Sequence, residues 1–238
     1  MTDTEIRYHQ RAIDGQTVFY REAGDPRHPT VVLLHGFPSS SHMFRNLIPA
    51  LAEDYHVIAT DHIGFGASSM PTVDEFSYSF DHLADITWQL LNELDLGRFA
   101  IYIQDYGAPI GLRIAAAHPE RISGLIVQNG NAYTEGFTPF WDLLFAHAKD
   151  RQGNEAAVRA LLEIDGTRFQ YVDGVPAERL DRVSPDNWVI DQAGLNRPGN
   201  KEIQLQLLWD YQFNVPLYPT FQAYFRAHQP PTLITWGK

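Results

Sequence analysis

Cysteine is absent from this chain of 238 residues. Its absence excludes disulfide bonds, thiolate-ligated metal sites and a cysteine nucleophile. Basic residues are also scarce, because Lys and Arg together number 18 against 29 for Asp and Glu, which gives a formal net charge of -11. No basic cluster is available to follow a phosphate backbone, so we expect no binding of nucleic acid.

The sequence also lacks any apolar run of membrane-spanning length. Its first residues, Met1 to Glu5, carry neither the basic flank nor the apolar stretch of a signal peptide. We therefore expect a cytoplasmic protein that does not bind membranes. No His-x-x-Glu-His-type or paired-carboxylate spacing is present, so we expect no metal site, and we expect no cofactor.

What the sequence does contain is an alternation of strand and helix patterns. An Asp14-Gly15 turn between residues 8–13 and 16–22 predicts an antiparallel hairpin at the start of the fold. Later strands are predicted from continuous apolar runs at residues 30–34, 55–60, 99–103, 125–127 and 232–236. Helical spacing or a capping serine predicts helices within residues 44–51, 79–94 and 110–117. Runs without polar alternation indicate strands covered on both faces, so the predicted fold class is α/β with a mostly parallel, doubly wound sheet.

Residues 130–226 break this alternation with short helical pieces that are rich in aromatic residues and interrupted by Gly and Pro. We interpret them as a helical cap inserted into a core of residues 1–129 and 227–238. Because the insertion lies between two strands, it should cover their carboxyl ends, where open parallel sheets bind ligands.

One strand-to-helix junction stands out as a candidate catalytic turn. Asp105 follows the apolar run at 99–103, and Gly107 follows two residues later. This arrangement is typical of a nucleophile elbow, a strained turn that lifts its central side chain above the sheet edge and needs a small residue after it. The serine version, Gly-x-Ser-x-Gly, does not occur in the sequence, which argues against a serine esterase. Taken alone, the junction also fits a simple turn in which Asp105 caps the following helix.

Four segments carry a resemblance to a known family: His35-Gly36-Phe37-Pro38, residues 61–68, the turn around Asp105, and residues 231–238. In this order and spacing they resemble the α/β-hydrolase superfamily, specifically its aspartate-nucleophile branch of haloalkane dehalogenases and epoxide hydrolases. The resemblance covers essentially the whole chain.

The resemblance implies that Asp105 attacks a carbon atom and forms an alkyl-enzyme ester. The backbone N–H groups of Phe37 and Tyr106 would make the oxyanion hole, and a histidine supported by an acid would activate water. The implied partners are water and a small neutral organic substrate, either an epoxide or an alkyl halide, with no cofactor.

Two departures from the family pattern bear on the substrate. Haloalkane dehalogenases commonly place Trp and Asn where this chain has Tyr106 and Phe37, which weakens the halide interpretation. Epoxide hydrolases instead use two cap tyrosines, for which the candidates here are Tyr133, Tyr171, Tyr211, Tyr218 and Tyr224. As substrate-binding residues of the cap we expect Trp141, Tyr171, Trp209, Tyr211 and Tyr218.

The family places its base histidine after an eighth strand and its acid after the sixth or the seventh. Asn129 follows the sixth strand here, as in members whose acid follows the seventh. We therefore expect both partners of Asp105 beyond Lys238, in a segment of roughly 50 to 60 residues with the last strand and the closing helix. We assign His35 and His62 to holding loops around the site, and Asp61 to binding backbone N–H groups. A competing hypothesis is a non-catalytic pseudo-hydrolase that binds a small apolar ligand or a partner protein.

Overall fold

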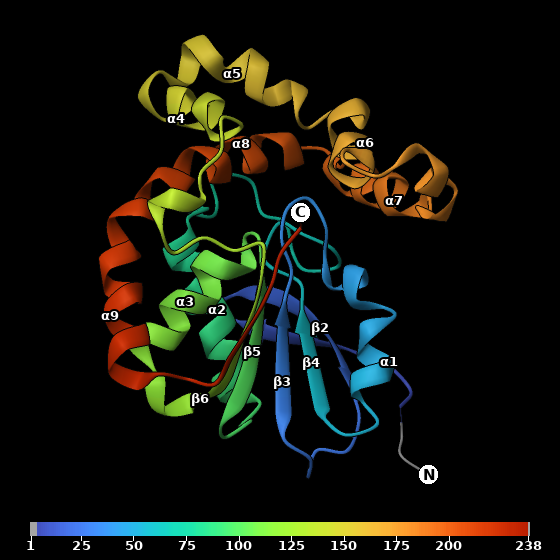
Figure 1. Ribbon diagram of the computed structural model, residues 1–238, viewed down its shortest axis with the longest axis vertical. Coiled ribbons are helices and arrows are strands. Elements are labelled where there is room, and N and C mark those ends of the chain that lie inside the picture. Colours follow the sequence, from blue (N-terminus) through green and yellow to red (C-terminus); the bar gives the residue numbers. More distant parts are fainter. Residues whose placement is uncertain (1–3, 238) are drawn as a thin grey trace.

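The computed structural model describes residues 4–237 and shows a seven-stranded sheet within them, in the order β1-β2-β4-β3-β5-β6-β7 (Figure 1). The strands are β1 (Arg7–Ile13), β2 (Gln16–Ala23), β3 (Thr30–Leu34), β4 (His56–Thr60), β5 (Phe99–Gln104), β6 (Ile122–Gln128) and β7 (Thr232–Thr235). The β1-β2 and β2-β4 pairs are antiparallel and the others are parallel. The predicted hairpin and mostly parallel sheet are confirmed. Residues 1–3, which belong to the segment tested for a signal peptide, and residue 238, which ends the last family-like segment, lie outside the described residues.

Helices cover both faces of the sheet and its upper edge. They are α1 (Leu47–Leu51), α2 (Phe80–Glu93), α3 (Gly107–Ala117), α4 (Trp141–Lys149), α5 (Arg151–Ala160), α6 (Ile164–Val172), α7 (Asp186–Leu195), α8 (Asn200–Asp210) and α9 (Tyr218–His228). Figure 1 shows α2, α3 and α9 on one side of the sheet and α1 on the other, with α4 to α8 above the strand ends. No helix within residues 4–237 is long and apolar enough to cross a membrane.

The core forms because the central strands bury side chains on both faces. Every residue of β3 and β4 is buried. Val32 and Leu34 pack into the cluster beneath α2 and α3, while Val31 and Leu33 pack into the cluster beneath α1. Since successive side chains of a strand point to opposite faces, a continuous apolar run is what a central strand requires.

The final strand lies at the sheet edge. Leu233 and Ile234 of β7 are 58% and 66% exposed. Within the described residues this strand pairs only with β6. The additional strand and closing helix stay a prediction.

The insertion after β6 is helical, as expected. Helices α4 to α8 form the lid, whereas α9 returns from the lid to pack beside α3 (Figure 1). The division into a core of residues 1–129 and 227–238 and a cap of residues 130–226 stays a prediction. The lid lies above the ends of the parallel strands, which brings it over the turn that carries Asp105.

Candidate active site

Asp105 occupies the turn between β5 and α3. Its φ angle is 49°, in the left-handed region that non-glycine residues rarely adopt. A Cβ atom on Gly107 would lie 2.4 Å from the carbonyl oxygen of Leu34, so only glycine fits there. Helix α3 has Tyr106 as its N-cap residue without a side-chain capping bond, so the alternative in which Asp105 caps the helix is not observed. The strained turn of an elbow is therefore present.

Two backbone donors meet at one oxygen of this carboxylate. The N–H groups of Phe37 and Tyr106 each donate to Asp105 Oδ1 at 2.7 Å. Close approach is possible because residue 36 is glycine, since a Cβ atom there would lie 2.3 Å from the Asp105 Cβ. The expected oxyanion donors are thus brought together, and Oδ2 takes part in neither bond.

The ionisation of Asp105 is set by opposing influences. Burial raises the pKa of the Asp105 carboxyl above its ordinary value, while the hydrogen bonds from Phe37 and Tyr106 lower it. No cationic side chain among residues 4–237 contributes to this balance. The side chain nevertheless remains partly accessible, because a cavity opens beside it. A carboxylate with a raised pKa and an open path to a ligand is a candidate nucleophile.

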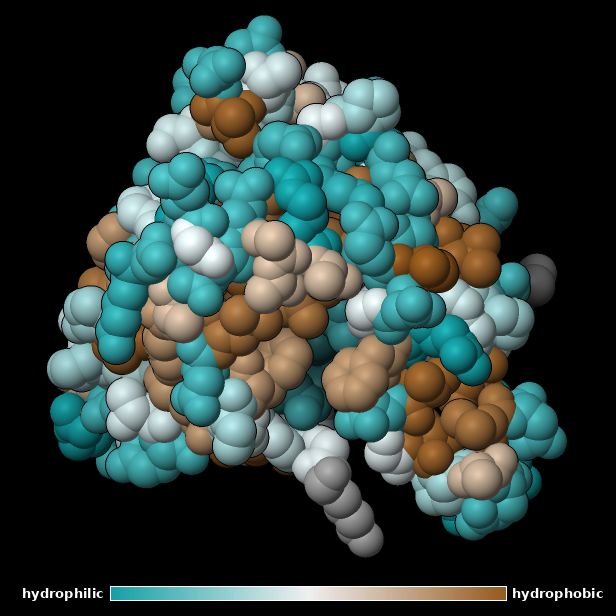
Figure 2. All heavy atoms as spheres, turned by 90° about the horizontal axis from the view of Figure 1, so that it is seen from above, coloured by the Kyte–Doolittle hydropathy of each residue, from teal (hydrophilic) through white to brown (hydrophobic). Residues whose placement is uncertain are grey.

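The cavity at Asp105 has a volume of about 100 Å³ and lies under the lid. Its other lining residues are Phe37, Tyr106, Phe140, Trp141, Leu144, Leu161, Gly166, Phe169, Gln170, Leu208 and Tyr211. Phe140 and Phe169 are also 53% and 50% exposed, so they reach from the cavity to the outer surface. Figure 2 shows the protein from above, the side on which the lid lies in Figure 1. This face is mainly hydrophilic, with apolar patches between the polar side chains.

Three buried tyrosines gather near the carboxylate. Tyr106 and Tyr211 line the cavity, and Tyr218 lies next to Tyr211. Burial raises the pKa of Tyr106 and of Tyr211 well above the ordinary value, and the charge of Asp105 raises both further. Both hydroxyls are therefore neutral and able to donate a hydrogen bond. The Tyr106 hydroxyl has no partner within the described residues, whereas the side chains of Tyr211 and Tyr218 interact with each other.

Several expected cap residues lie outside this cavity. The Tyr171 hydroxyl donates to Asp191 instead, and the Trp209 ring packs against Phe213 and beneath the Arg151 guanidinium. These two residues do not line the cavity, because their helices turn the side chains toward other parts of the lid. Trp141, Tyr211 and Tyr218 are where they were expected, in or beside it.

The remaining two tyrosine candidates are also elsewhere. Tyr133 is half exposed and lines a second cavity. Tyr224 of α9 is buried against Phe225 and His228. Neither contributes to the lining around Asp105. Of the five candidates, Tyr211 lines that cavity and Tyr218 lies next to Tyr211.

The loop residues around the site have structural partners. His35 Nε2 accepts from the His62 backbone N–H at 3.1 Å, and the His62 side chain contacts the His35 carbonyl at 3.0 Å. Burial lowers the pKa of both imidazoles, so both stay neutral. The Asp61 carboxylate accepts from the N–H groups of Ser41 and Ala67 at 2.7 and 2.8 Å, as expected of a loop-forming carboxylate.

Asn129 directly follows β6, one residue beyond the Gln104–Gln128 pair, so it lies at the end of the strand next to the one that leads into Asp105. Its φ angle is 49°, and its N–H donates to the Thr235 carbonyl at 3.3 Å, which joins the ends of β6 and β7. No histidine among residues 4–237 lines the Asp105 cavity. The same residues contain no cluster of three or more potential metal ligands.

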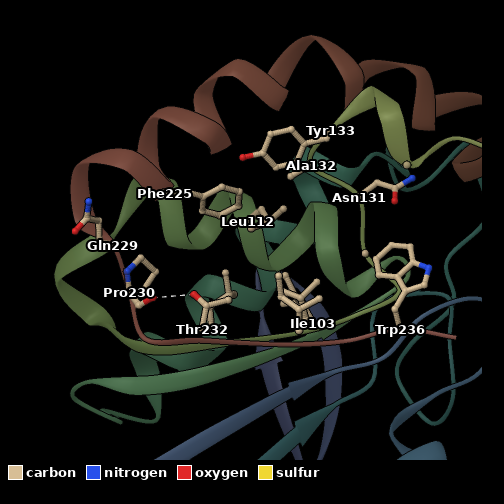
Figure 3. A pocket seen from close by; sticks show the side chains of 15 residues that line it. Ile103, Leu112, Asn131, Ala132, Tyr133, Phe225, Gln229, Pro230, Thr232 and Trp236 are labelled. Carbon is tan, nitrogen blue, oxygen red and sulfur yellow. Dashed lines mark hydrogen bonds between the residues drawn. The ribbon is translucent and has the colours of Figure 1, made fainter. Parts of the chain in front are cut away.

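A larger cavity lies between α9 and the sheet edge (Figure 3). Its volume is about 430 Å³, and its wall is mainly apolar, with Leu112, Phe225 and Ile234 among the lining side chains. Within the part of the chain that the structure describes, no carboxylate, histidine or cationic side chain contributes to the lining. Sequence reasoning did not find this cavity, because its residues come from separate elements with no shared motif.

Comparisons with known proteins agree with this geometry. The chain is 44% identical over 243 residues to the uncharacterized hydrolase YNR064C of Saccharomyces cerevisiae, covering 100% of this chain and 82% of that protein. It is 33% identical over 250 residues to a cis-3-alkyl-4-alkyloxetan-2-one decarboxylase of Shewanella oneidensis, covering 100% of this chain and 75% of that protein. The crystal structure of the haloalkane dehalogenase DbeA from Bradyrhizobium elkani USDA94 matches with a TM-score of 0.73 at 26% identity, covering 98% of this chain and 81% of that one.

A family model settles the wider relationship. The model described as alpha/beta hydrolase fold matches residues 29–238, which includes every strand from β3 to β7 and the whole of the lid. The strained turn at Asp105 and the mostly parallel sheet agree with this fold. The chain belongs to the alpha/beta hydrolase family.

Proposed function

We propose that this protein is a hydrolase in which Asp105 attacks a carbon of a small strained oxygen ring, most simply an epoxide, and forms an alkyl-enzyme ester. The observation that carries the proposal is the geometry of the carboxylate. Oδ1 is held by two backbone N–H groups at 2.7 Å each, while Oδ2 keeps its lone pairs for attack. The turn fixes this orientation before any substrate arrives.

In the first step, Asp105 Oδ2 forms a bond to a ring carbon and the carbon–oxygen bond of the ring breaks. The electron pair of that bond goes to the ring oxygen. A neutral hydroxyl of Tyr211 or Tyr106 donates its hydrogen bond to this oxygen and can transfer the proton as charge develops. The products of the step are a β-hydroxyalkyl ester of Asp105 and a tyrosinate, which regains its proton from solvent.

The hydroxyl donors favour oxygen over halide as the leaving atom. An alkoxide leaving group needs a proton, whereas a halide ion leaves without one. Relatives point the same way in part, because the Shewanella oneidensis protein is named for an oxetan-2-one, which is a strained oxygen ring. Alkyl halides remain the second candidate, since the DbeA structure belongs to a haloalkane dehalogenase.

The second step returns the enzyme to its starting state. Water attacks the ester carbonyl carbon of Asp105, and the resulting oxyanion at Oδ1 receives the Phe37 and Tyr106 N–H bonds. Collapse of this intermediate releases a diol and regenerates the carboxylate. A general base must deprotonate the water, and we place that base outside the described residues, because no histidine among them lines the cavity.

The cavity also indicates the character of the substrate. Its wall is mostly aromatic and aliphatic, and Asp105 is the one ionisable group besides the tyrosines among its described lining residues. An anionic substrate would meet a carboxylate without any cation to compensate it. We therefore propose small, neutral, largely apolar substrates.

Intact-mass and peptide mass spectrometry after incubation with a matched panel tests this function. The panel comprises a 1,2-epoxyalkane, a 1-haloalkane of equal chain length and a cis-disubstituted β-lactone. We expect a mass increase with the epoxide that maps to the peptide containing Asp105 and persists, because losing general-base help typically costs about 10² to 10⁴ in rate.

Each other outcome would contradict part of the proposal. Faster labelling by the haloalkane than by the epoxide would show that the preferred leaving group is a halide. Steady diol release would show that a general base is present among these residues. No adduct from any compound would favour the alternative, a pseudo-hydrolase that binds a small apolar ligand or a partner without catalysis.

A further inference from the structure

A buried carboxyl from the lid lies against the turn that carries Phe37. Asp191 of α7 is only 6% exposed and accepts a hydrogen bond from the hydroxyl of Tyr171 in α6. Ser39, from the core, lines the same cleft as Asp191 and lies close enough to influence both Asp191 and Tyr171, while its hydroxyl donates to the Ser40 carbonyl at 3.4 Å. Three side chains from three segments therefore meet where the lid rests on the core.

Ser39 is mechanically tied to the oxyanion hole. Its N–H donates to the Gly36 carbonyl at 3.0 Å, which closes a turn over residues 36–39. Phe37, inside the same turn, donates its N–H to Asp105 Oδ1 at 2.7 Å. A shift of Ser39 is thus transmitted to the donor that orients the nucleophile.

The surroundings of Asp191 do not provide an ion pair for it. Arg45 donates to the Asn187 side chain at 2.7 Å and acts on Asp191 only through space. The adjoining cleft of about 410 Å³ is lined by Arg21, His42, Asp61 and Arg197, of which Arg197 binds the carbonyls of residues 64 and 66. Burial raises the pKa of the Asp191 carboxyl, and the contacts with Tyr171, Ser39 and Arg45 oppose that change.

A buried carboxyl without an ion pair is a poor way to stabilise a fold, because desolvation costs more than a neutral side chain of similar size. Its specific directional contacts are what a nonpolar replacement would lack. We propose that Asp191 is a positioning residue that, through Ser39, holds the Gly36–Ser39 turn and so keeps the Phe37 N–H aimed at Asp105. This inference rests on the proposed role of Asp105 and assigns Asp191 no contact with substrate.

The test compares Asp191→Ala with Arg197→Gln, which removes lid–core hydrogen bonds that do not reach the turn. The rate of Asp105 labelling is measured against epoxide concentration. We expect Asp191→Ala to lower the rate at saturation by about 10- to 100-fold with little change in the half-saturating concentration, because a misplaced reacting group loses rate rather than binding. Arg197→Gln should stay within about twofold of the unaltered protein, and Asp191→Asn, which keeps a hydrogen-bonding side chain, should recover most of the rate.

Hydrogen exchange of the peptide that contains residues 36–40 gives a second readout that needs no substrate. We expect faster exchange there in Asp191→Ala than in Arg197→Gln, and Ser39→Ala, which removes the hydroxyl beside Asp191, serves if Asp191→Ala does not fold. Equal exchange and equal rate losses in the two variants would overturn the proposal. If the unaltered protein forms no adduct, the proposed function fails, but the exchange comparison still decides whether Asp191 holds the turn.

Discussion

Two of the cavities of this protein, the one at Asp105 and the one beside β7, differ in more than size. The one at Asp105 has a volume of about 100 Å³, and the one beside β7 about 430 Å³. The smaller cavity brings a carboxylate and the hydroxyls of Tyr106 and Tyr211 together beneath the lid. The larger offers mainly apolar walls, with amide and hydroxyl groups at Asn131, Tyr133 and Gln229 (Figure 3).

The comparison shows that volume alone does not locate chemistry. A wall of hydrocarbon can hold an apolar ligand but cannot stabilise charge that develops during a reaction. The smaller cavity has two backbone donors fixed on one oxygen and a carboxylate held in a strained turn. Both features depend on close backbone approach at Gly36 and Gly107.

The largest effect on adduct formation is expected when the carboxylate is removed from one cavity and introduced at the other. Asp105→Asn should abolish adduct formation, because an amide is not a nucleophile toward carbon and the shape is almost unchanged. Asn131→Asp, which places a carboxylate at the larger cavity, should gain no adduct at position 131. Peptide mass spectrometry decides both, with a check that the amide introduced at position 105 has not deamidated back to a carboxylate. An adduct at position 131 would mean that any carboxylate beside a cavity suffices.

A smaller effect is expected from the hydroxyls. Tyr211→Phe should slow labelling by the epoxide by about 10- to 100-fold, because Tyr106 remains as a second donor and a full loss of acid catalysis costs about 10² to 10⁴. Labelling by the haloalkane should change by less than about threefold, since halide leaves without a proton. The matched control is Tyr133→Phe at the larger cavity, for which we expect no change with either compound. Equal losses for both leaving groups would assign Tyr211 to packing alone.

The smallest effect concerns pH. Because burial raises the pKa of Asp105, labelling should decline on the acid side at a pH above the ordinary range of aspartate. The stability of the fold changes with pH in the opposite direction to the labelling rate. A raised folded-state pKa stabilises the fold below the unfolded value of 3.8, and that contribution is lost as pH rises through the folded pKa.

Asp105→Asn should therefore melt above the unaltered protein near neutral pH, with a gap that closes in acid. The gap is worth about 2 to 4 °C for each kcal/mol of relieved charge burial in a protein of this size. Thermal melts of the two proteins across the pH range measure this gap. The stability contributions of Asp191 and Asp210, whose pKa values are also raised, are common to both proteins and cancel in the gap. A gap in melting temperature that does not change with pH would show that ionisation of the buried Asp105 carboxyl does not destabilise the fold.

Much of the fold could be predicted because its strands carry local patterns. The apolar runs of β3 and β4 have no polar alternation, and every residue in them is buried. The helix predicted after Ser79 begins at Phe80, and the Ser79 hydroxyl accepts from the His82 N–H. Asp105, Phe37 and Tyr106 could be placed together only through the family resemblance. The structure shows that the loop at Phe37 and the turn at Asp105 follow the neighbouring parallel strands β3 and β5.

The cap could not be predicted to the same depth. Tyr171, like Trp209 and Tyr211, is an aromatic residue in a helical segment between β6 and β7. Only the packing of these segments decides which aromatic side chain reaches the cavity. Asp191 gave no signal at all, because a single aspartate in a lid helix resembles any solvated carboxylate until its burial is known. The exposure of β7 likewise depends on which partners the strand finds and not on its own residues.

Under the proposed mechanism, the hydrogen bonds that both end on Asp105 Oδ1 also decide which atoms of the product come from the protein. If Oδ2 attacks and water later adds to the carboxyl carbon, the first product molecule carries an oxygen atom from the protein and not from the solvent. Water then replaces the missing atom in the side chain. Where a general base lets water complete the cycle, a single turnover in ¹⁸O-labelled water would leave the label in Asp105. The aspartate would then be a reagent that each cycle consumes and restores.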